Sequence, residues 1–292
     1  MTILHCSFWQ QVFSITPMPG QIVLLTLFAA LLHASWNALL RGGTDRLWSM
    51  TIMCLTIALT CAFMAVFLPL PARPSWPYAV LSALLHVGYN LCLVQSYQSG
   101  DFGKTYPIAR GVSPLLVTGG AAVFAGEKIG LPAFGGITLI SVGILLLAIQ
   151  RGKLAIRELQ YPLATGAFIA AYSVVDGLGA RLSGHALSYT VWMSAFWGVL
   201  MPALYIVLRD GKSLVRWRPG LLLAAVGGLV SLLAYGIIIY AMTASPMGIV
   251  SALRETSILF AAILGYLFLG EALTLRKMLG CAVIVAGTLM TS

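Results

Sequence analysis

Charged side chains are scarce in this sequence. Asp, Glu, Lys and Arg together make up 9% of the 292 residues, whereas about 25% is usual for a soluble domain. Apolar residues make up 60%, and they gather in runs long enough to cross a lipid bilayer. No stretch is long and polar enough to form a soluble domain. The sequence therefore predicts an all-α integral membrane protein that crosses the membrane many times and is surrounded by membrane lipids.

Several kinds of chemistry lack the residues that they need. The five cysteines form no CxxC pair, which argues against a disulfide framework, an iron–sulfur cluster or a metal site. No phosphate-binding loop of the form GxxxxGK[ST] occurs, so we expect no ATP hydrolysis. No nucleophile, base or metal ligands cluster in the sequence, and we expect neither an enzyme nor a bound cofactor. The formal charge of +9 lies mostly in short loops, where it orients the chain in the membrane, so we expect no nucleic-acid partner.

The first residues do not resemble a secretion signal. Residues 1–20 contain no Lys or Arg, whereas a cleavable signal peptide begins with a basic region. We expect this segment to be a short interfacial stretch, unless the true start is Met18, directly before the first span.

Ten apolar segments have the length of a membrane-spanning helix, which needs about 20 residues. Most of their boundaries carry a charge, a Gly or a Pro. Because the loops are tight, we expect neighbouring helices to be antiparallel and in contact. The expected spans are 21–40, 48–69, 77–98, 105–125, 131–150, 161–180, 189–208, 220–241, 248–269 and 277–291.

Two parts of the sequence repeat one another. Residues 108–147 align with residues 252–291 without a gap, and eleven of the forty positions are identical. One of the identities pairs Arg110 with Arg254. A bias toward apolar residues would align Leu and Ile, but hardly Arg.

The repeat predicts the architecture. After the segment 1–20, residues 21–150 and 161–292 each hold five expected spans, and an odd number of spans turns the second copy upside down in the membrane. Ten helices would thus form two inverted five-helix repeats around a central cavity. Inverted repeats place their binding site near the middle of the membrane, between the halves.

Loop charge predicts the orientation. The loops after the odd-numbered spans hold twelve Lys and Arg residues, the loops after the even-numbered spans hold three, and the termini hold none. Cytoplasmic loops are enriched in Lys and Arg. We therefore expect a cell inner (plasma) membrane protein whose termini both lie outside the cytoplasm.

Short motifs resemble a known family. Gly-Glu opens the related runs "AGEKIGLPAFGGITLISVGILLLA" and "LGEALTLRKMLGCAVIVAGTLMTS", and a Ser113-Pro114-Leu115 turn stands within the span 105–125. The run "LLHASWNALLRGG" is similar to one branch of permeases. Together with the length, the number of spans and the repeat, these motifs resemble the drug/metabolite transporter superfamily in its ten-helix EamA-like branch.

The resemblance has clear implications. It implies that spans 1–4 and 6–9 surround a central cavity, that spans 5 and 10 are peripheral, and that transport is secondary and proceeds by alternating access. Many members of the family keep both termini in the cytoplasm, which conflicts with the loop charge, and we favour the loop charge.

Two arginines stand inside apolar spans. Arg110 and Arg254 lie about two turns into their expected helices, where a charge usually faces a partner, a wet cavity or a cargo. A guanidinium group offers a fixed fork that matches a carboxylate or a phosphate. The cargo interpretation competes with an internal ion pair, for which Glu255 is the obvious partner and Asp176 a possible one.

Titratable groups suggest proton coupling. Asp176 lies inside a span with Tyr172 one turn before it, and a carboxyl group in such a place can exchange protons near neutral pH. Glu255 and His33 are further candidates for the same role. For Asp176, a salt bridge with the nearby Arg181 is the competing interpretation.

Two polar stripes mark further candidate binding residues. His33, Trp36 and Asn37 share one helical face, and His86 and Asn90 share another. Polar side chains in a membrane avoid lipid and face the interior of the bundle. With Tyr172, Arg110 and Arg254 they make up the expected substrate site.

The Gly-Glu motifs have a structural interpretation. Glu127 and Glu271 each follow a span, and a negative charge stabilises the N-terminus of a helix. We expect each of them to cap or brace the helix that comes next.

The expected function is secondary transport of a small anionic or zwitterionic metabolite, such as an amino acid, exported in exchange for protons. The direction follows from the resemblance alone. A multidrug or cation exporter and a lipid-linked sugar flippase are the alternatives, and a non-transporting scaffold would not need a duplicated arginine. The sequence does not decide between a monomer and a dimer.

Overall fold

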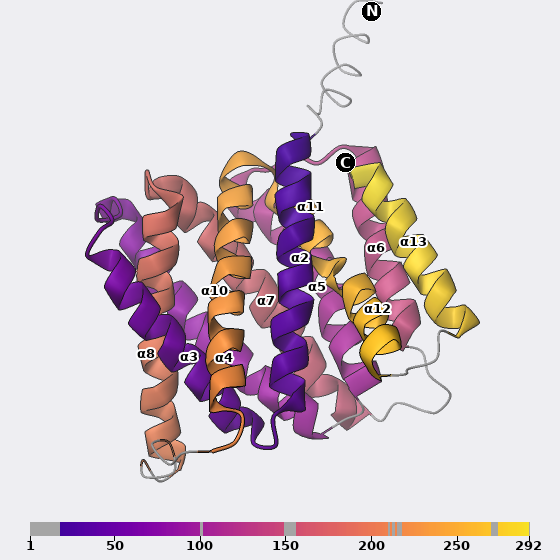
Figure 1. Cartoon of the computed structure of the whole chain (residues 1–292). Coiled ribbons are helices and arrows are strands. Elements are labelled where there is room, and N and C mark those ends of the chain that lie inside the picture. Colours follow the sequence, from indigo (N-terminus) through magenta and orange to yellow (C-terminus); the bar gives the residue numbers. More distant parts are fainter. Residues whose placement is uncertain are drawn as a thin grey trace, which may run out of the picture.

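The computed structural model describes residues 18–99, 102–148, 156–209, 211, 214, 218–269 and 274–291. These residues form helices, and no strand occurs among them. Figure 1 shows the bundle of helices that results. In chain order the elements are α2 (Gly20–Gly42), α3 (Arg46–Ala65), the 3-10 helix η1 (Arg73–Ser75), α4 (Trp76–Ser99), α5 (Phe102–Ala125), α6 (Leu131–Ala148), α7 (Ile156–Leu182), α8 (Ala186–Leu208), α10 (Leu221–Ala244), α11 (Met247–Glu255), α12 (Ser257–Leu269) and α13 (Leu275–Thr291).

Each of the ten expected spans contains helix. Among the described residues, seven helices are long and apolar enough to cross a membrane, and Leu131–Leu147 of α6 is a shorter apolar helix. The chain is therefore a multi-pass membrane protein, whereas the number of ten spans stays a prediction. The N-terminal segment up to residue 17 and Glu271 lie outside the described residues.

The expected span 248–269 is not one continuous helix. Its helix is broken at Thr256, between α11 and α12. The Thr256 hydroxyl donates a hydrogen bond to the Leu253 carbonyl oxygen at 2.6 Å, and the Thr256 N–H donates to the same oxygen at 3.1 Å. This tight turn replaces the regular hydrogen bond of an α-helix. By contrast, α5 remains helical through Pro107 and Pro114.

Apolar side chains cover the outside of the bundle, and some charged side chains are buried within it. Phe63 and Leu222 are 68% and 75% exposed, whereas Arg110, Asp176 and Arg254 are buried. A soluble protein has the opposite distribution. The exposed apolar surface suits the hydrocarbon of a bilayer, and the buried charges occupy the only environment where a membrane tolerates them.

The two halves of the chain interleave. Helix α4 packs against α7, while α10 packs against α2. Helix α5 also contacts α7, as α12 contacts α2, and α3 packs against α8. Figure 1 shows that α2 begins and α13 ends at the same end of the bundle. The interior is thus bounded by helices from both halves.

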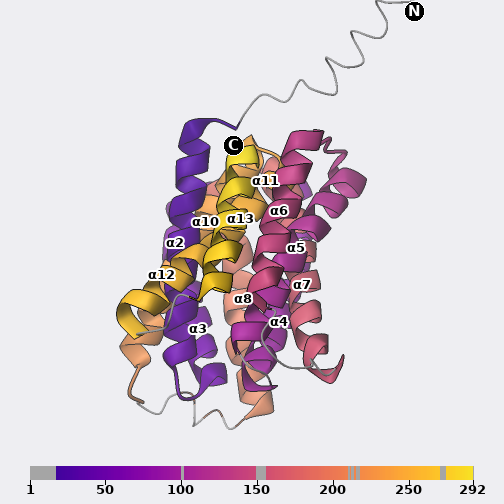
Figure 2. The ribbon, with the colours of Figure 1, turned by 90° about the vertical axis from the view of Figure 1, so that its right-hand side faces the viewer.

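Helices α6 and α13 lie side by side at one edge of the bundle (Figures 1 and 2). Their backbones approach closely at glycines. A methyl group added to Gly136 would lie 2.7 Å from the Gly287 carbonyl oxygen, and one added to Gly143 would lie 3.0 Å from the Gly280 carbonyl oxygen. Small residues allow such close packing of helices in membranes.

A larger side chain at the glycine contact between α6 and α13 should lower the stability of the protein. In Gly287→Ala the new methyl group would lie 2.6 Å from the Gly136 carbonyl oxygen, so we expect a loss of about 1–3 kcal/mol in unfolding free energy from overpacking. Gly119→Ala is the control, because nothing lies within 4 Å of that position. Unfolding in detergent should separate the two variants, and equal stabilities would show that the crossing is not tightly packed.

Candidate functional site

Two arginines share one carboxylate in the interior. Arg110 comes from α5, and Arg254 and Glu255 end α11. Arg110 Nη1 lies 3.1 Å from Glu255 Oε2, and Arg254 Nη2 lies 3.0 Å from Glu255 Oε1. All three side chains are at most 1% exposed. This cluster, named here the arginine cluster, carries two positive charges and one negative charge.

His33 connects the arginine cluster to α2. Arg110 Nη2 contacts His33 Nε2, and the Trp36 indole N–H donates a hydrogen bond to His33 Nδ1 at 3.1 Å. Guanidinium and indole groups can only donate hydrogen bonds. A protonated imidazole would face donors on both of its nitrogens and would add a third positive charge. This geometry therefore favours a neutral His33.

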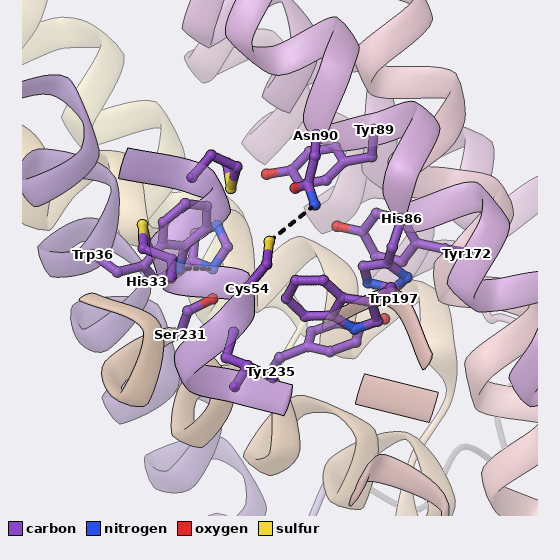
Figure 3. A pocket seen from close by; sticks show the side chains of 13 residues that line it. His33, Trp36, Cys54, His86, Tyr89, Asn90, Tyr172, Trp197, Ser231 and Tyr235 are labelled. Carbon is purple, nitrogen blue, oxygen red and sulfur yellow. Dashed lines mark hydrogen bonds between the residues drawn. The ribbon is translucent and has the colours of Figure 1, made fainter. Parts of the chain in front are cut away.

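A small pocket lies beside His33, in the interior of the bundle (Figure 3). Five of the residues expected at the substrate site line it: His33, Trp36, His86, Asn90 and Tyr172. The other residues that line the pocket do not belong to the predicted substrate site, and these are Met50, Met53, Cys54, Ile57, Tyr89, Trp197, Ser231 and Tyr235.

Three expected site residues are buried near the pocket without lining it. Arg110 and Arg254 lie in the arginine cluster. The Asn37 side chain donates a hydrogen bond to the His33 carbonyl oxygen at 2.8 Å within its own helix. The arginines reach the pocket through their charge, since both act electrostatically on His33, and Arg254 also acts on His86.

Aromatic rings form one wall of the pocket. The His86 ring stacks on Tyr172 with ring centres 4.0 Å apart and on Trp197 with ring centres 5.5 Å apart. Tyr235 meets the same ring edge-on at 5.3 Å. These residues come from α4, α7, α8 and α10, so the wall joins both halves of the chain.

Two polar groups of the lining are buried and lack a hydrogen-bond partner among the described residues. They are the Tyr89 hydroxyl and the Trp197 indole N–H. A buried donor without a partner costs about 1–3 kcal/mol. Within a pocket, such donors are ready to bind the acceptor oxygens of a small molecule.

The cavity is small in this conformation. Its volume is about 40 Å³, and one water molecule needs about 10–15 Å³. The cavity therefore has room for a few water molecules, and a cargo of the size of an amino acid would require its walls to move apart. Met50 and Met53 line it, and methionine adapts its shape easily.

Asp176 is buried in the same interior. Its carboxylate accepts hydrogen bonds from the Tyr189 hydroxyl at 2.9 Å and from the Tyr235 hydroxyl at 2.5 Å. It forms no ion pair with Arg181, because that guanidinium binds Glu127 at 2.6 Å. Asp176 thus contacts the pocket through Tyr235.

Glu127 braces a different helix from the one expected. Its Oε2 accepts a hydrogen bond from the Met247 N–H at 2.9 Å, at the start of α11. The prediction that it caps the next helix, α6, is wrong. The N-terminus of α11 offers the same unpaired N–H groups, and Arg181 holds the carboxylate there.

A second ion cluster lies near the N-terminal end of α10. Asp45 precedes α3, and its Oδ2 lies 2.5 Å from Arg209 and 2.9 Å from Arg218, which flank the segment between α8 and α10. Arg181 meanwhile binds the Met242 and Ser245 carbonyl oxygens at the far end of α10. Side chains from both halves are therefore tied together at each end of the bundle.

The pKa of Asp45 reflects this cluster. Partial burial raises the pKa, but hydrogen bonds from the Trp48 N–H, Arg218 and Arg209 outweigh burial and hold the pKa below the ordinary value of 3.8. A lowered pKa means that the charged group stabilises the fold fully above the unfolded value, and that this contribution is lost as the pH falls through the folded value.

Asp45→Asn tests this contribution. Asn keeps a capping oxygen for α3 but removes the charge. We expect the melting temperature of the variant to lie below that of the wild type at neutral pH. The gap should close when the pH is lowered below 3.8. A gap that is independent of pH would show that the charge of Asp45 does not stabilise the fold.

The described residues contain no group of three or more His, Cys, Asp or Glu side chains that could hold a metal ion. The site is instead a buried cationic cluster, a pocket with aromatic walls and free donors, and a carboxylate behind it. Such a combination has the features of a membrane solute pathway.

Residues 159–292 match the EamA-like transporter family. The match confirms the resemblance to the drug/metabolite transporter superfamily and supports a membrane transporter of small molecules. EamA is a family of transporters and not of enzymes. No curated protein matches the chain.

A solved structure shares the fold. It is described as "Crystal structure of protein", with a TM-score of 0.76 and 17% sequence identity. The alignment covers 94% of this chain and 97% of the other. The likeness concerns the fold alone, and it extends over nearly the whole chain.

Proposed function

We propose that this protein is a secondary transporter that moves a small anionic or zwitterionic metabolite, such as an amino acid, by alternating access, with protons as the coupling ion. The observation that carries the proposal is the arginine cluster beside the pocket. It buries two guanidinium groups with one carboxylate, which leaves one positive charge without a partner in the cluster.

The repeat explains why the charges do not balance. Glu255 follows Arg254, whereas Gly111 follows the equivalent Arg110. The second half therefore supplies one carboxylate for two arginines. Burying an uncompensated charge is costly, and an anionic group in the pocket would reduce this cost.

The pocket favours the same kind of cargo. No acidic side chain stands among the residues that line it in the described part of the chain. The Tyr89 hydroxyl and the Trp197 N–H are free to donate hydrogen bonds to a carboxylate, and hydrogen bonds from neutral donors to a charged acceptor are strong.

The small size of the pocket is consistent with alternating access. Ion clusters tie the halves together at both ends of the bundle, and the cavity has a volume of only about 40 Å³. We take this conformation to be an occluded state. Opening toward either side would break one of the two ion clusters and widen the cavity.

Asp176 is the best placed proton carrier of the three expected. Glu255 is held between two arginines as their shared ion-pair partner, while the contacts of His33 favour the neutral imidazole. The partners of Asp176 are hydroxyl groups, which can both donate and accept hydrogen bonds. They can therefore satisfy both protonation states of the carboxyl.

The repeat and the loop charges suggest how the chain is arranged in the membrane. The equivalent contacts of α4 with α7 and of α10 with α2 support an inverted repeat. We place the protein in the inner membrane with the Asp45 end of the bundle in the cytoplasm, because loop charge favours that orientation. Both termini would then lie outside the cytoplasm.

The cation exporter is kept as a second candidate, because the aromatic wall could bind an organic cation through its ring faces. The arginine cluster opposes it, since its excess charge would repel such a cargo.

Transport into proteoliposomes tests the proposal. The panel holds glutamate, phenylalanine, lysine, lactate and the lipophilic cation tetraphenylphosphonium, each with and without a pH gradient. We expect anionic or zwitterionic solutes to be moved. Arg110→Ala should reduce their flux at least about tenfold, because it removes the excess positive charge beside the pocket, and a tenfold change corresponds to about 1.4 kcal/mol.

Arg110→Ala is informative because Arg254 and Glu255 remain in this variant as a pair of opposite charges. Arg73→Ala is the matched control, since Arg73 is exposed outside the bundle core. If only tetraphenylphosphonium is moved and Arg110→Ala leaves its flux intact, the proposed cargo class is wrong.

A further inference from the structure

Hydroxyl groups from three helices surround the Asp176 carboxylate. The Tyr189 hydroxyl of α8 lies at 2.9 Å, the Tyr235 hydroxyl of α10 lies at 2.5 Å, and Ser82 of α4 donates a further hydrogen bond. Asp176 itself is 0% exposed. Any proton that reaches it must therefore pass one of these groups.

The three hydroxyl groups differ in their freedom to move. Tyr189 is 0% exposed, and its ring packs directly on Gly179. Ser82 is also 0% exposed, and its Oγ lies 3.1 Å from His86 Nδ1. Tyr235 is partly exposed and lines the pocket. Of the three, only Tyr235 can turn its O–H group toward a cargo.

Other charged and titratable groups act on the carboxylate as well. Arg254 of α11 interacts electrostatically with Asp176, and it also interacts with Tyr172, which lies on α7 like Asp176. On α4, His86 stands behind Ser82.

Protonation of Asp176 reverses one hydrogen bond. An ionised carboxylate only accepts, and all three hydroxyl groups then donate to it. A protonated carboxyl must donate its own O–H, and a phenol oxygen can accept it. When the Tyr235 oxygen accepts the hydrogen bond from the protonated Asp176 carboxyl, the Tyr235 hydroxyl hydrogen must point away from Asp176. It then points into the pocket.

We propose that Tyr235 is the positioning residue that links the proton on Asp176 to the cargo in the pocket, so that proton and anion bind together. The inference rests on the proposed function, and it changes the expected direction. Protonation supplies a donor to the pocket and removes a negative charge near it, and both effects favour an anion. Proton and cargo are therefore carried in the same direction, as in uptake driven by an inward proton gradient, instead of being exchanged.

Linkage makes the coupling quantitative. If a proton raises the affinity for the cargo, the cargo raises the affinity for the proton by the same factor. With one linked proton, the affinity for the cargo rises by up to about tenfold for each unit of lower pH. An exchanger of the same cargo would show the opposite slope.

The hydrogen-bond reversal can be tested without any cargo. Infrared difference spectra of the purified full-length protein in lipid nanodiscs, recorded as the pH is changed, report carboxyl C=O and tyrosine C–O bands. In the wild type both bands should change over the same pH range. Asp176→Asn should lose both signals, Tyr235→Phe should lose the tyrosine signal, and Tyr189→Phe should keep it.

Contrary outcomes are clear. A wild-type spectrum in which no tyrosine band follows the carboxyl band would overturn the proposal, and this measurement needs no variant to fold. So would a tyrosine signal that survives in Tyr235→Phe and disappears in Tyr189→Phe.

A second arm measures the direction of coupling. Uptake of labelled glutamate and phenylalanine into proteoliposomes is recorded at several pH values outside, with a fluorescent pH indicator inside. We expect the solute and protons to enter together, and we expect Tyr235→Phe to lose most of the pH dependence while Tyr189→Phe retains it. Alkalinisation inside during uptake would overturn the proposal.

The two arms separate the possible failures. If neither solute is moved but the tyrosine band still follows the carboxyl band, the cargo class of the proposed function is wrong and the role of Tyr235 stands. If solutes are moved without any tyrosine signal, the transport function stands and the role of Tyr235 is wrong.

Discussion

Replacing Glu255 with Gln should destabilise the protein more than any other single removal of charge. Glu255 is the shared partner of Arg110 and Arg254, at 3.1 Å and 3.0 Å, and it is 0% exposed. The variant would leave two guanidinium groups buried without a negative partner. Breaking a buried ion pair in this way costs about 3–5 kcal/mol. Unfolding in detergent, followed by circular dichroism, measures the loss.

Glu127→Gln provides the matched control for this measurement. It makes the same chemical change in the ion pair with Arg181, in which the Arg181 side chain is 31% exposed and the Glu127 side chain is 10% exposed. An ion pair that is partly open to solvent contributes less than a fully buried one. A similar loss in both variants would mean that the arginine cluster is hydrated or that another group neutralises it.

Asp176→Asn should abolish the effect of a pH gradient on transport. Asn keeps the size of the side chain but cannot carry the proton. We expect the gradient-driven component of glutamate or phenylalanine flux to disappear, while exchange of the same solute across the membrane without a gradient continues. The measurement compares the two modes in the same proteoliposomes.

The exchange mode serves as the internal control for Asp176→Asn, because it shows that the variant is folded and still binds the cargo. Continued stimulation by the pH gradient would exclude Asp176 as the proton carrier. The loss of both modes would instead assign it a role in folding or cargo binding.

Much of the fold was predictable because a bilayer restricts the backbone. Within lipid, N–H and C=O groups must be paired inside each segment, so long apolar runs form helices. The break at Thr256 was not predictable in this way. It depends on a hydroxyl group that competes for the Leu253 carbonyl oxygen, and threonine occurs in continuous helices as well.

The site was predictable where it is polar. His33, Trp36, His86, Asn90 and Tyr172 converge on one pocket, because polar stripes on membrane helices face away from lipid. The apolar residues of α3 that line the pocket could not be predicted in this way, since Met53 and Ile57 would be equally common on a helix face that contacts lipid.

Partnerships across the chain were the hardest to predict. The sequence indicated Glu255 as an internal partner for the buried arginines, and in the structure it pairs with Arg254 and with Arg110, which is 145 residues away from Glu255. The contact depends on how α5 and α11 pack, and one sequence holds no direct record of that. The single signal available was the missing carboxylate at Gly111, which leaves Arg110 without a local partner.

The glycine crossing of α6 and α13 bears on which parts of the protein move. Backbone oxygens meet glycine at Gly136 and Gly287 and again two turns away at Gly143 and Gly280. Two such contacts prevent the helices from sliding past each other or rotating. The pair therefore forms a stationary seam, and spin labels on α6 and α13 should keep a constant separation while the remaining helices open and close.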